Sequence, residues 1–157
     1  MELSFPFDAR DLGGVPDRRY SSADIAAVAK LIFTNGILGE GDLAVSAGDG
    51  LSVTLAPGGA VIDGRFYVLD ASKTLPIEAN ATGLDRIDLV VLRLDGDARA
   101  IYPAVIEGVP ASTPVRPAPV SAGALHDIPL AAVEVPNAAY AMFAGYITPL
   151  APAAAGI

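Results

Sequence analysis

The sequence has no cysteine and no tryptophan, and it has a single histidine, His126. Without cysteine there is no disulfide, no thiolate metal ligand and no cysteine nucleophile. One histidine also cannot supply the two or three imidazoles that a histidine-based zinc site takes within one subunit. A site built from His126 would need a symmetric trimer in which each copy gives one imidazole. We expect instead a loop histidine beside Asp127.

Positive charge and long apolar runs are also scarce. Lys and Arg number 10 against 18 Asp and Glu, so the formal net charge is −8. This balance disfavours contact with nucleic-acid phosphates or anionic lipid. Gly, Pro, Asp or Arg interrupts each apolar run before the roughly 18 residues that cross a bilayer, and residues 1–10 lack the basic start of a signal peptide. We therefore expect a soluble protein that binds no nucleic acid and inserts into no membrane.

Large side chains are few, since aromatic residues make up 6% of the chain while hydrophobic residues make up 52%. The 157 residues suffice for one domain, and its core must consist mainly of small aliphatic side chains. A core of this kind gains stability when further surface is buried between copies, so we expect a homo-oligomer.

One helix is predicted, over residues 22–34, after an irregular arm over residues 1–20 that is rich in turn-forming residues. Ser21 or Ser22 can cap this helix, and Asp24 follows Ser21 at the spacing of a capping box. Large apolar residues recur at helical spacing, and alanines between them allow close approach to a neighbour. These apolar residues are Ile25, Val28, Leu31 and Ile32.

Short strands separated by Gly, Pro and Asp are predicted for the rest of the chain. The dipeptides Asp49-Gly50 and Asp63-Gly64 each lie between segments of strand character, which predicts two hairpins. Residues 87–94 contain a continuous apolar run that is typical of a central strand covered on both faces. The next strand, residues 100–106, contains Pro103, which favours an edge position or a bulge. The last predicted strands cover residues 128–135 and 141–148.

These patterns together predict a mainly β protein with one N-terminal α-helix, folded as an antiparallel β-sandwich or a partly open barrel. We expect one domain over residues 21–148, which follows the arm at 1–20. A flexible tail rich in Ala and Pro is expected over residues 149–157.

Two pairs of carboxylates are the candidate acid and base for a reaction such as glycoside hydrolysis. Asp95 and Asp97 flank Gly96 as in a tight turn, where Asp bonds to its own backbone. Asp85 and Asp88 lie three residues apart at the start of a strand, so they point to opposite faces. We interpret both pairs as structural.

The arginines beside the central strand, Arg86 and Arg93, must find a carboxylate or a carbonyl partner there. Asp88 is the near candidate in the sequence. We therefore expect these arginines to form structural ion pairs.

An acidic stretch with Glu40, Asp42 and Asp49 lacks the regular spacing of a calcium-binding loop, so we expect a solvated hairpin there. The sequence also lacks the serine-nucleophile elbow, the phosphate-binding loop and the dinucleotide-binding fingerprint. We assign no catalytic, cofactor-binding or metal-binding residue, expect no cofactor, and predict a protein that is not an enzyme.

Five segments, in their order along the chain, resemble the N-terminal module of siphophage upper baseplate proteins and related tail structural proteins. Together they extend over much of residues 17–148. The first surrounds the predicted helix, the second contains the hairpins, and the third is the strand that begins Arg-Ile-Asp. The segments are 17–37, 43–64, 85–95, 107–114 and 128–133.

This resemblance implies a virion component of the phage tail, made in the cytoplasm of the bacterial host. It would dock to other tail or baseplate proteins at the tail tip, anchor or adapt fibre or receptor-binding parts, and act as a homo-oligomer, a trimer or hexamer. The alternative is a module that binds host-surface carbohydrate by aromatic stacking. Candidate residues for a host glycan are Tyr67, Tyr102, Tyr140 and Tyr146.

Overall fold

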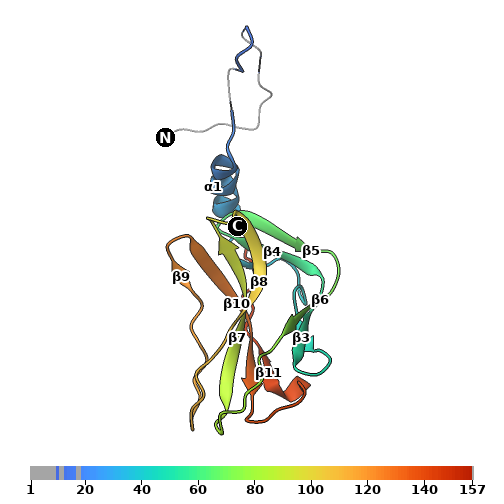
Figure 1. Ribbon diagram of the computed structural model, residues 1–157. Helices are drawn as coiled ribbons and strands as arrows, with labels where there is room; N and C mark the ends of the chain where they lie inside the picture. The colour runs from blue at the N-terminus through green and yellow to red at the C-terminus, as the bar shows by residue number, and fades with distance from the viewer. Residues whose placement is uncertain (1–9, 11–12, 17–18, 157) are drawn as a thin grey trace.

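A computed structural model describes residue 10 and residues 13–16 and 19–156. It contains one α-helix, α1, at the N-terminal end of this described part, followed by antiparallel β-sheets. The predicted fold class, mainly β with a single N-terminal helix, is confirmed. In Figure 1, α1 projects as a rod from one end of an elongated β body.

Helix α1 (Ser22–Ile32) begins with the predicted capping box. The backbone N–H of Ser21 donates to Asp24 Oδ2 over 2.8 Å, and the N–H of Asp24 donates to Ser21 Oγ over 3.2 Å. These bonds lower the pKa of Asp24 below its usual value, so the cap is present at neutral pH and is lost as the pH falls through that lowered pKa. The helix ends at Ile32, two residues before the predicted end, because Phe33 is extended and pairs with Gly156.

Three antiparallel sheets form the body. The sheet beside α1 has the order β1 (Gly36–Ile37), β4 (Gly58–Ile62), β5 (Arg65–Leu69). A second sheet has the order β2 (Val45–Ala47), β3 (Ser52–Leu55), β6 (Lys73–Pro76). The largest sheet has the order β11 (Ile147–Pro149), β10 (Leu125–Val135), β7 (Arg86–Asp95), β8 (Ala100–Ile106), with β9 (Ser121–Ala122) also paired to β10.

Most of the predicted strands are confirmed. Asp49-Gly50 joins β2 to β3 and Asp63-Gly64 joins β4 to β5, and both pairs of strands are antiparallel. Strand β7 has a neighbour on each side, while β8, which contains Pro103, ends its sheet. The sequence patterns did not predict strands β1, β6 and β9. The strand predicted over 141–148 is instead a 3-10 turn, η1 (Ala144–Tyr146), followed by β11.

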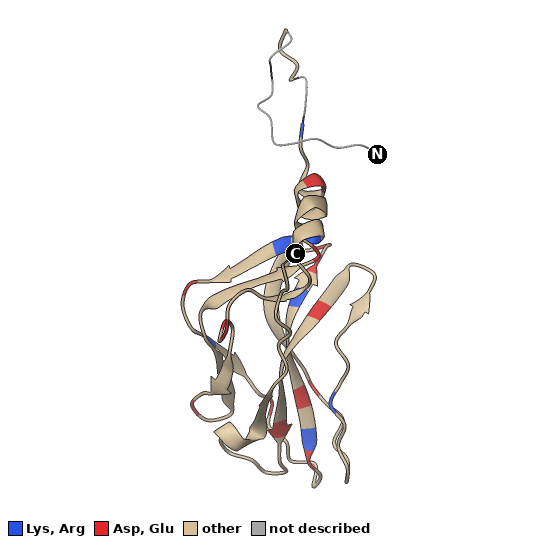
Figure 2. Ribbon diagram, turned by 180° about the vertical axis from the view of Figure 1, so that it is seen from behind, with Lys and Arg blue, Asp and Glu red and all other residues tan. Residues whose placement is uncertain are grey.

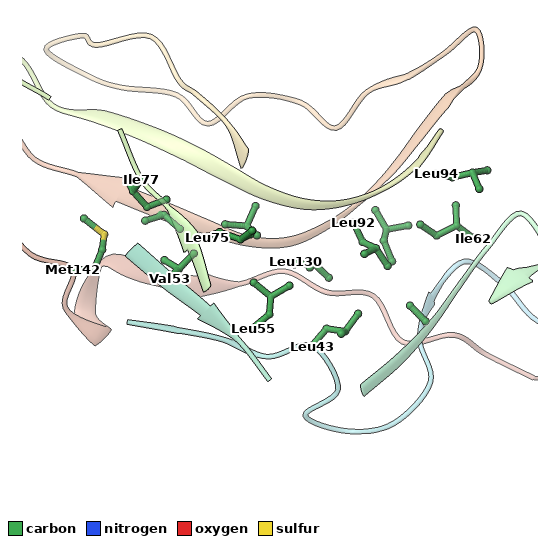
Figure 3. Close-up of a cluster of buried hydrophobic side chains, with 14 of the residues drawn as sticks. Leu43, Val53, Leu55, Ile62, Leu75, Ile77, Leu92, Leu94, Leu130 and Met142 are labelled. Carbon is green, nitrogen blue, oxygen red and sulfur yellow. The ribbon is translucent and has the colours of Figure 1, made fainter. Parts of the chain in front are cut away.

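The core lies between the sheets and consists mainly of aliphatic side chains (Figure 3). Strands β3 and β4 contribute from one side, and β7 and β10 contribute from the other. Met142, from the segment before η1, lies at one end of this cluster. The labelled side chains are Leu43, Val53, Leu55, Ile62, Leu75, Ile77, Leu92, Leu94, Leu130 and Met142.

The C-terminal segment runs along β1 and is not the free tail expected over residues 149–157. The backbone N–H of Ile37 donates to the carbonyl of Pro152, and that of Ala154 donates to the carbonyl of Ile37, both over 2.8 Å. The N–H of Thr34 donates to the carbonyl of Ala155 over 3.0 Å. These are backbone bonds, which need no alternating side-chain pattern and therefore leave no sequence signal. The C-terminus consequently lies beside the base of α1 (Figure 1). Most of the arm predicted over 1–20 lies outside the described residues.

Small residues of α1 pack against the turn between β4 and β5. Ala26 and Ala29 are the buried residues of α1. Gly64, in the turn, has φ +72°, and a Cβ added to it would collide with the carbonyl oxygen of Ala26. Only glycine meets both demands, the left-handed backbone and the contact with the helix.

Replacing Gly64 with alanine should therefore weaken the packing of α1 against this turn. We expect Gly64→Ala to destabilise the fold by roughly 3 kcal/mol, from left-handed strain plus steric overlap. Gly83→Ala is the matched control, because Gly83 has φ +86° with open space around its Cβ position, and it should cost about 1 kcal/mol. Urea denaturation of both variants measures the difference, and equal shifts in the midpoint would contradict the proposed contact.

Candidate docking surface

Asp85 and Asp88, which were predicted to point to opposite faces, form hydrogen bonds with different parts of the chain. Asp88 is 1% exposed and accepts hydrogen bonds from Arg86 Nε and from the N–H of Gly108, both over 2.9 Å. Asp85 is exposed and accepts from the N–H of Asn137 over 2.8 Å. Burial alone would lower the pKa of Arg86, but the hydrogen bond to Asp88 and neighbouring carboxylates raise it. The pair is thus not brought together for acid and base chemistry.

Asp95 and Asp97 lie in the turn between β7 and β8. Oδ1 of Asp95 accepts the N–H groups of Asp97 over 3.0 Å and of Ala98 over 2.9 Å. The hydroxyl of Tyr102 donates to Oδ2 over 3.1 Å. These bonds, led by the one from Ala98, lower the pKa of Asp95. The side chain therefore has the turn-forming role that the sequence predicts.

The sequence suggested Asp88 as the partner of both arginines, but Arg93 does not pair with it. Successive side chains of a strand point to opposite faces, so Arg93 cannot lie on the face that Arg86 and Asp88 share. Its partner is Asp127, which lies opposite it on β10. The guanidinium makes two hydrogen bonds to this carboxylate, over 2.8 and 2.9 Å.

The acidic stretch between β1 and β3 contains a further structural carboxylate, Asp42. Oδ2 of Asp42 accepts the N–H of Gly39 over 3.0 Å and that of Gly59 over 2.9 Å. Glu40 and Asp49 are exposed. Within the part of the chain that the structure describes, no group of three or more His, Asp or Glu side chains could hold a metal ion.

His126 lies on β10 and not in a loop. Its Nδ1 is 2.9 Å from Asp63 Oδ2, and its Nε2 is 3.3 Å from Asn35 Nδ2. Lys30 of α1 lies on the same aspartate, with Nζ 3.8 Å from Oδ1. These contacts connect the helix, the turn after β4 and the largest sheet, so they fix the base of α1 to the body.

The apolar residues of α1 that recur at helical spacing do not face the core. Ile25 is 54% exposed, Leu31 is 72% exposed and Ile32 is 44% exposed, while Ala26 and Ala29 face the body. Together with Val28, which is partly buried, these three residues form a surface that we call the helix stripe. Large apolar residues gathered in this way are typical of an interaction surface.

A second apolar surface, the sheet patch, consists of Leu38, Phe66 and Val68, which are 43%, 53% and 75% exposed. Phe66 and Val68 alternate along β5, so they share its outer face. Leu38 lies over Gly59, which pairs with Val68 in register. The ring of Phe66 also packs edge-on against Phe33, just after α1, with centroids 5.9 Å apart. The helix stripe and the sheet patch thus lie at the same end of the molecule.

A cavity of about 590 Å³ lies between β5 and the turn that joins β7 to β8. Arg65, Phe66 and Tyr67 line one side, and Arg99 lines the other. Burial raises the pKa of Tyr67. Arg99 has φ +54°, a left-handed backbone that an L residue adopts at a cost.

The four candidate tyrosines for glycan stacking fall into two separate groups. Tyr67 lines the cavity, and Tyr102 bonds to Asp95 beside it. Tyr140, which is 81% exposed, and Tyr146 both pack edge-on against Phe143, with centroid separations of 6.3 and 5.5 Å. This second group surrounds η1, at the end of the body away from α1 (Figure 1).

Comparison of the chain with protein-family models, with curated proteins and with solved structures finds no match. Over the described residues, no helix has both the length and the hydrophobicity needed to span a membrane. The two apolar surfaces, the cavity and the aromatic group are the features of the described residues that bear on function.

The buried ion pair allows a direct test of the structural role of the carboxylates. Asp88→Ala would leave buried Arg86 with only the exposed Glu107, 3.2 Å away, as a carboxylate partner, and we expect a loss of about 3 kcal/mol in the free energy of unfolding. Asp85→Ala, which removes one exposed hydrogen bond, should cost about 1 kcal/mol. Chemical denaturation distinguishes the two, and a nearly unchanged midpoint for Asp88→Ala would argue against a structural role.

Proposed function

We propose that this chain is a structural component of a bacteriophage tail or baseplate, without enzymatic activity. It docks to the tail tip through the end that carries α1, and it anchors or adapts fibre or receptor-binding parts. The observation that carries the proposal is the gathering of exposed apolar side chains, the helix stripe and the sheet patch, at that one end.

The chemistry of this end supports docking to protein. The large exposed residues of the helix stripe and the sheet patch are aliphatic or aromatic, and Figure 2 shows few charged residues on α1. A formal net charge of −8 over the whole chain disfavours nucleic acid as the partner. The ordered resemblance to siphophage baseplate modules indicates which protein partners to test, and it supports the proposal of a virion component.

The end of the body opposite α1 offers a second surface for an attached part. It presents the turn between β2 and β3 and the aromatic group around η1. Tyr140 and Phe143 are exposed there. We assign this end to the fibre or receptor-binding component.

The carboxylates support a structural and not a catalytic role. Asp88, Asp95 and Asp127 each accept hydrogen bonds from backbone N–H groups, and Asp88 and Asp127 also pair with arginines. Groups held in this way have no free oxygen pair directed at a common substrate position, which acid and base catalysis requires.

Particles produced with and without the chain test the proposal. In a phage or tail-like particle whose genome encodes it, deletion should give tails that lack tip structures in negative-stain images, and the wild-type gene should restore them. The double variant Phe66→Asp with Val68→Asp should fold but be absent from purified particles, because charge on the sheet patch opposes its burial.

Val115→Asp is the matched control, since Val115 is 76% exposed but lies outside both apolar surfaces. It should enter particles as the wild type does. Intact tails with a full set of tip structures after deletion would refute the proposed function.

The cavity favours a second candidate function, the binding of a host glycan that bears a carboxylate. Two arginines can pair with a carboxylate, and Phe66 and Tyr67 offer apolar ring surface for a sugar. The volume of about 590 Å³ is in the usual range for small-ligand sites.

Arg99→Gly tests this candidate without harming the fold. It removes the guanidinium and relieves the left-handed strain at Arg99, so stability should rise by about 1 kcal/mol while affinity falls at least about tenfold. The readout is a glycan array with sialylated and uronate-containing glycans, and Arg116→Ala is the control because Arg116 is exposed outside the cavity. An array without signal for the wild-type chain would exclude this candidate.

A further inference from the structure

We propose that α1 packs against the α1 helices of two other copies of this chain, in a parallel three-helix bundle formed by the helix stripe. The inference deepens the proposed function by dividing the two apolar surfaces: the helix stripe joins copies of the chain, and the sheet patch at the same end remains exposed to dock to the tail. It rests on the proposed function only in this respect. The evidence for it is the spacing of the apolar residues of α1, the exposure of their side chains and the charge on the helix.

The spacing within the stripe is that of a coiled coil. Ile25, Val28 and Ile32 lie three and four residues apart, which are the first, fourth and first positions of a seven-residue repeat. All three are β-branched, and β-branched residues at both of these positions favour three strands over two. Leu31 lies beside this seam, so it can cover its edge.

The faces of α1 are divided between the body and the stripe. Ala26 and Ala29 are buried, and Lys30 pairs with Asp63, so this side is occupied within one chain. At 100° per residue, the stripe is centred on a different side of the helix. Its large residues remain in water, and a helix of 11 residues gains little stability from its backbone alone. Packing of the stripe against other copies would supply the stability that the helix lacks in a single chain.

The charge on α1 favours another copy of the same chain over a different protein. Asp24 and Lys30 are its only charged residues. Asp24 is bonded to Ser21 in the cap, and Lys30 is paired with Asp63 on the side of the helix opposite the stripe. The stripe itself therefore carries no charge that would select a charged partner. An apolar seam with this repeat is complementary to itself. The helix also projects from the body, so three copies can bring their helices together with the bodies pointing the same way (Figure 1).

The mass of the full-length chain in solution is the first test. Light scattering should give three times the mass of one chain. For Ile25→Ser with Ile32→Ser, the concentration at which the assembly dissociates should rise at least about a hundredfold, because two buried side chains per helix are lost from the seam. Val109→Ser with Val115→Ser is the matched control, since these valines are 77% and 76% exposed on the loop after β8. Circular dichroism checks that both variants fold.

Cysteine cross-linking is the second test, and the absence of native cysteine makes it specific. Ile25→Cys places thiols next to one another at the seam, so oxidation by diamide should give covalent dimers within the trimer. Ala23→Cys places the thiol on the same helix but on its outward side, and it should stay monomeric on denaturing gels.

A monomeric wild-type chain at the highest concentration reached, or equal cross-linking of the two cysteine variants, would overturn the inference. A trimer that is nevertheless absent from particles would refute the proposed function and leave the bundle in place. Failure of one proposal is therefore distinguishable from failure of the other.

Discussion

The contact between the turn at Asp63-Gly64 and the small residues of α1 determines how the helix is oriented and which of its side chains are exposed. Gly64 lets the helix backbone approach at Ala26, while Asp63 holds Lys30 of the helix and His126 of the largest sheet. The helix is thereby fixed with Ala26 and Ala29 toward the body. Its large apolar side chains are directed to solvent as a consequence, so the contact of α1 with the body and the exposure of the helix stripe are two results of one constraint.

Much of the fold was predictable because it depends on local signals. The capping box at Ser21, the hairpin dipeptides, the central β7 and the edge position of β8 all follow from neighbouring residues. The seating of α1 did not follow, because periodicity locates an apolar face without saying whether the core or a partner covers it. The partner of Arg93 depends on the register of β10, and the path of residues 149–156 depends on backbone bonds to β1. Both are contacts between distant parts of the chain.

The candidate site was less predictable than the fold. The sequence singled out carboxylates and tyrosines, and the structure assigns the carboxylates to turns and ion pairs while separating the tyrosines into two groups. The sheet patch had no sequence signal, because Phe66 and Val68 look like ordinary strand residues until β5 is known to have an uncovered outer face. Ile25, Leu31 and Ile32 were noticed for their spacing, which serves self-association as well as it serves burial in a core.

Both ends of the described chain leave the body beside α1, and this has a mechanical consequence. A force that pulls on the two ends would act first at the base of α1, on the hydrogen bonds between Thr34 or Ile37 and the segment from Pro152 to Ala155 and on the contacts of the helix with Asp63 and Gly64. Because both ends depart from the same side, the hydrogen bonds would break one after another. Strands β7 and β10 would be loaded only after these contacts had separated. Tension along the chain would therefore reach the centre of the core last.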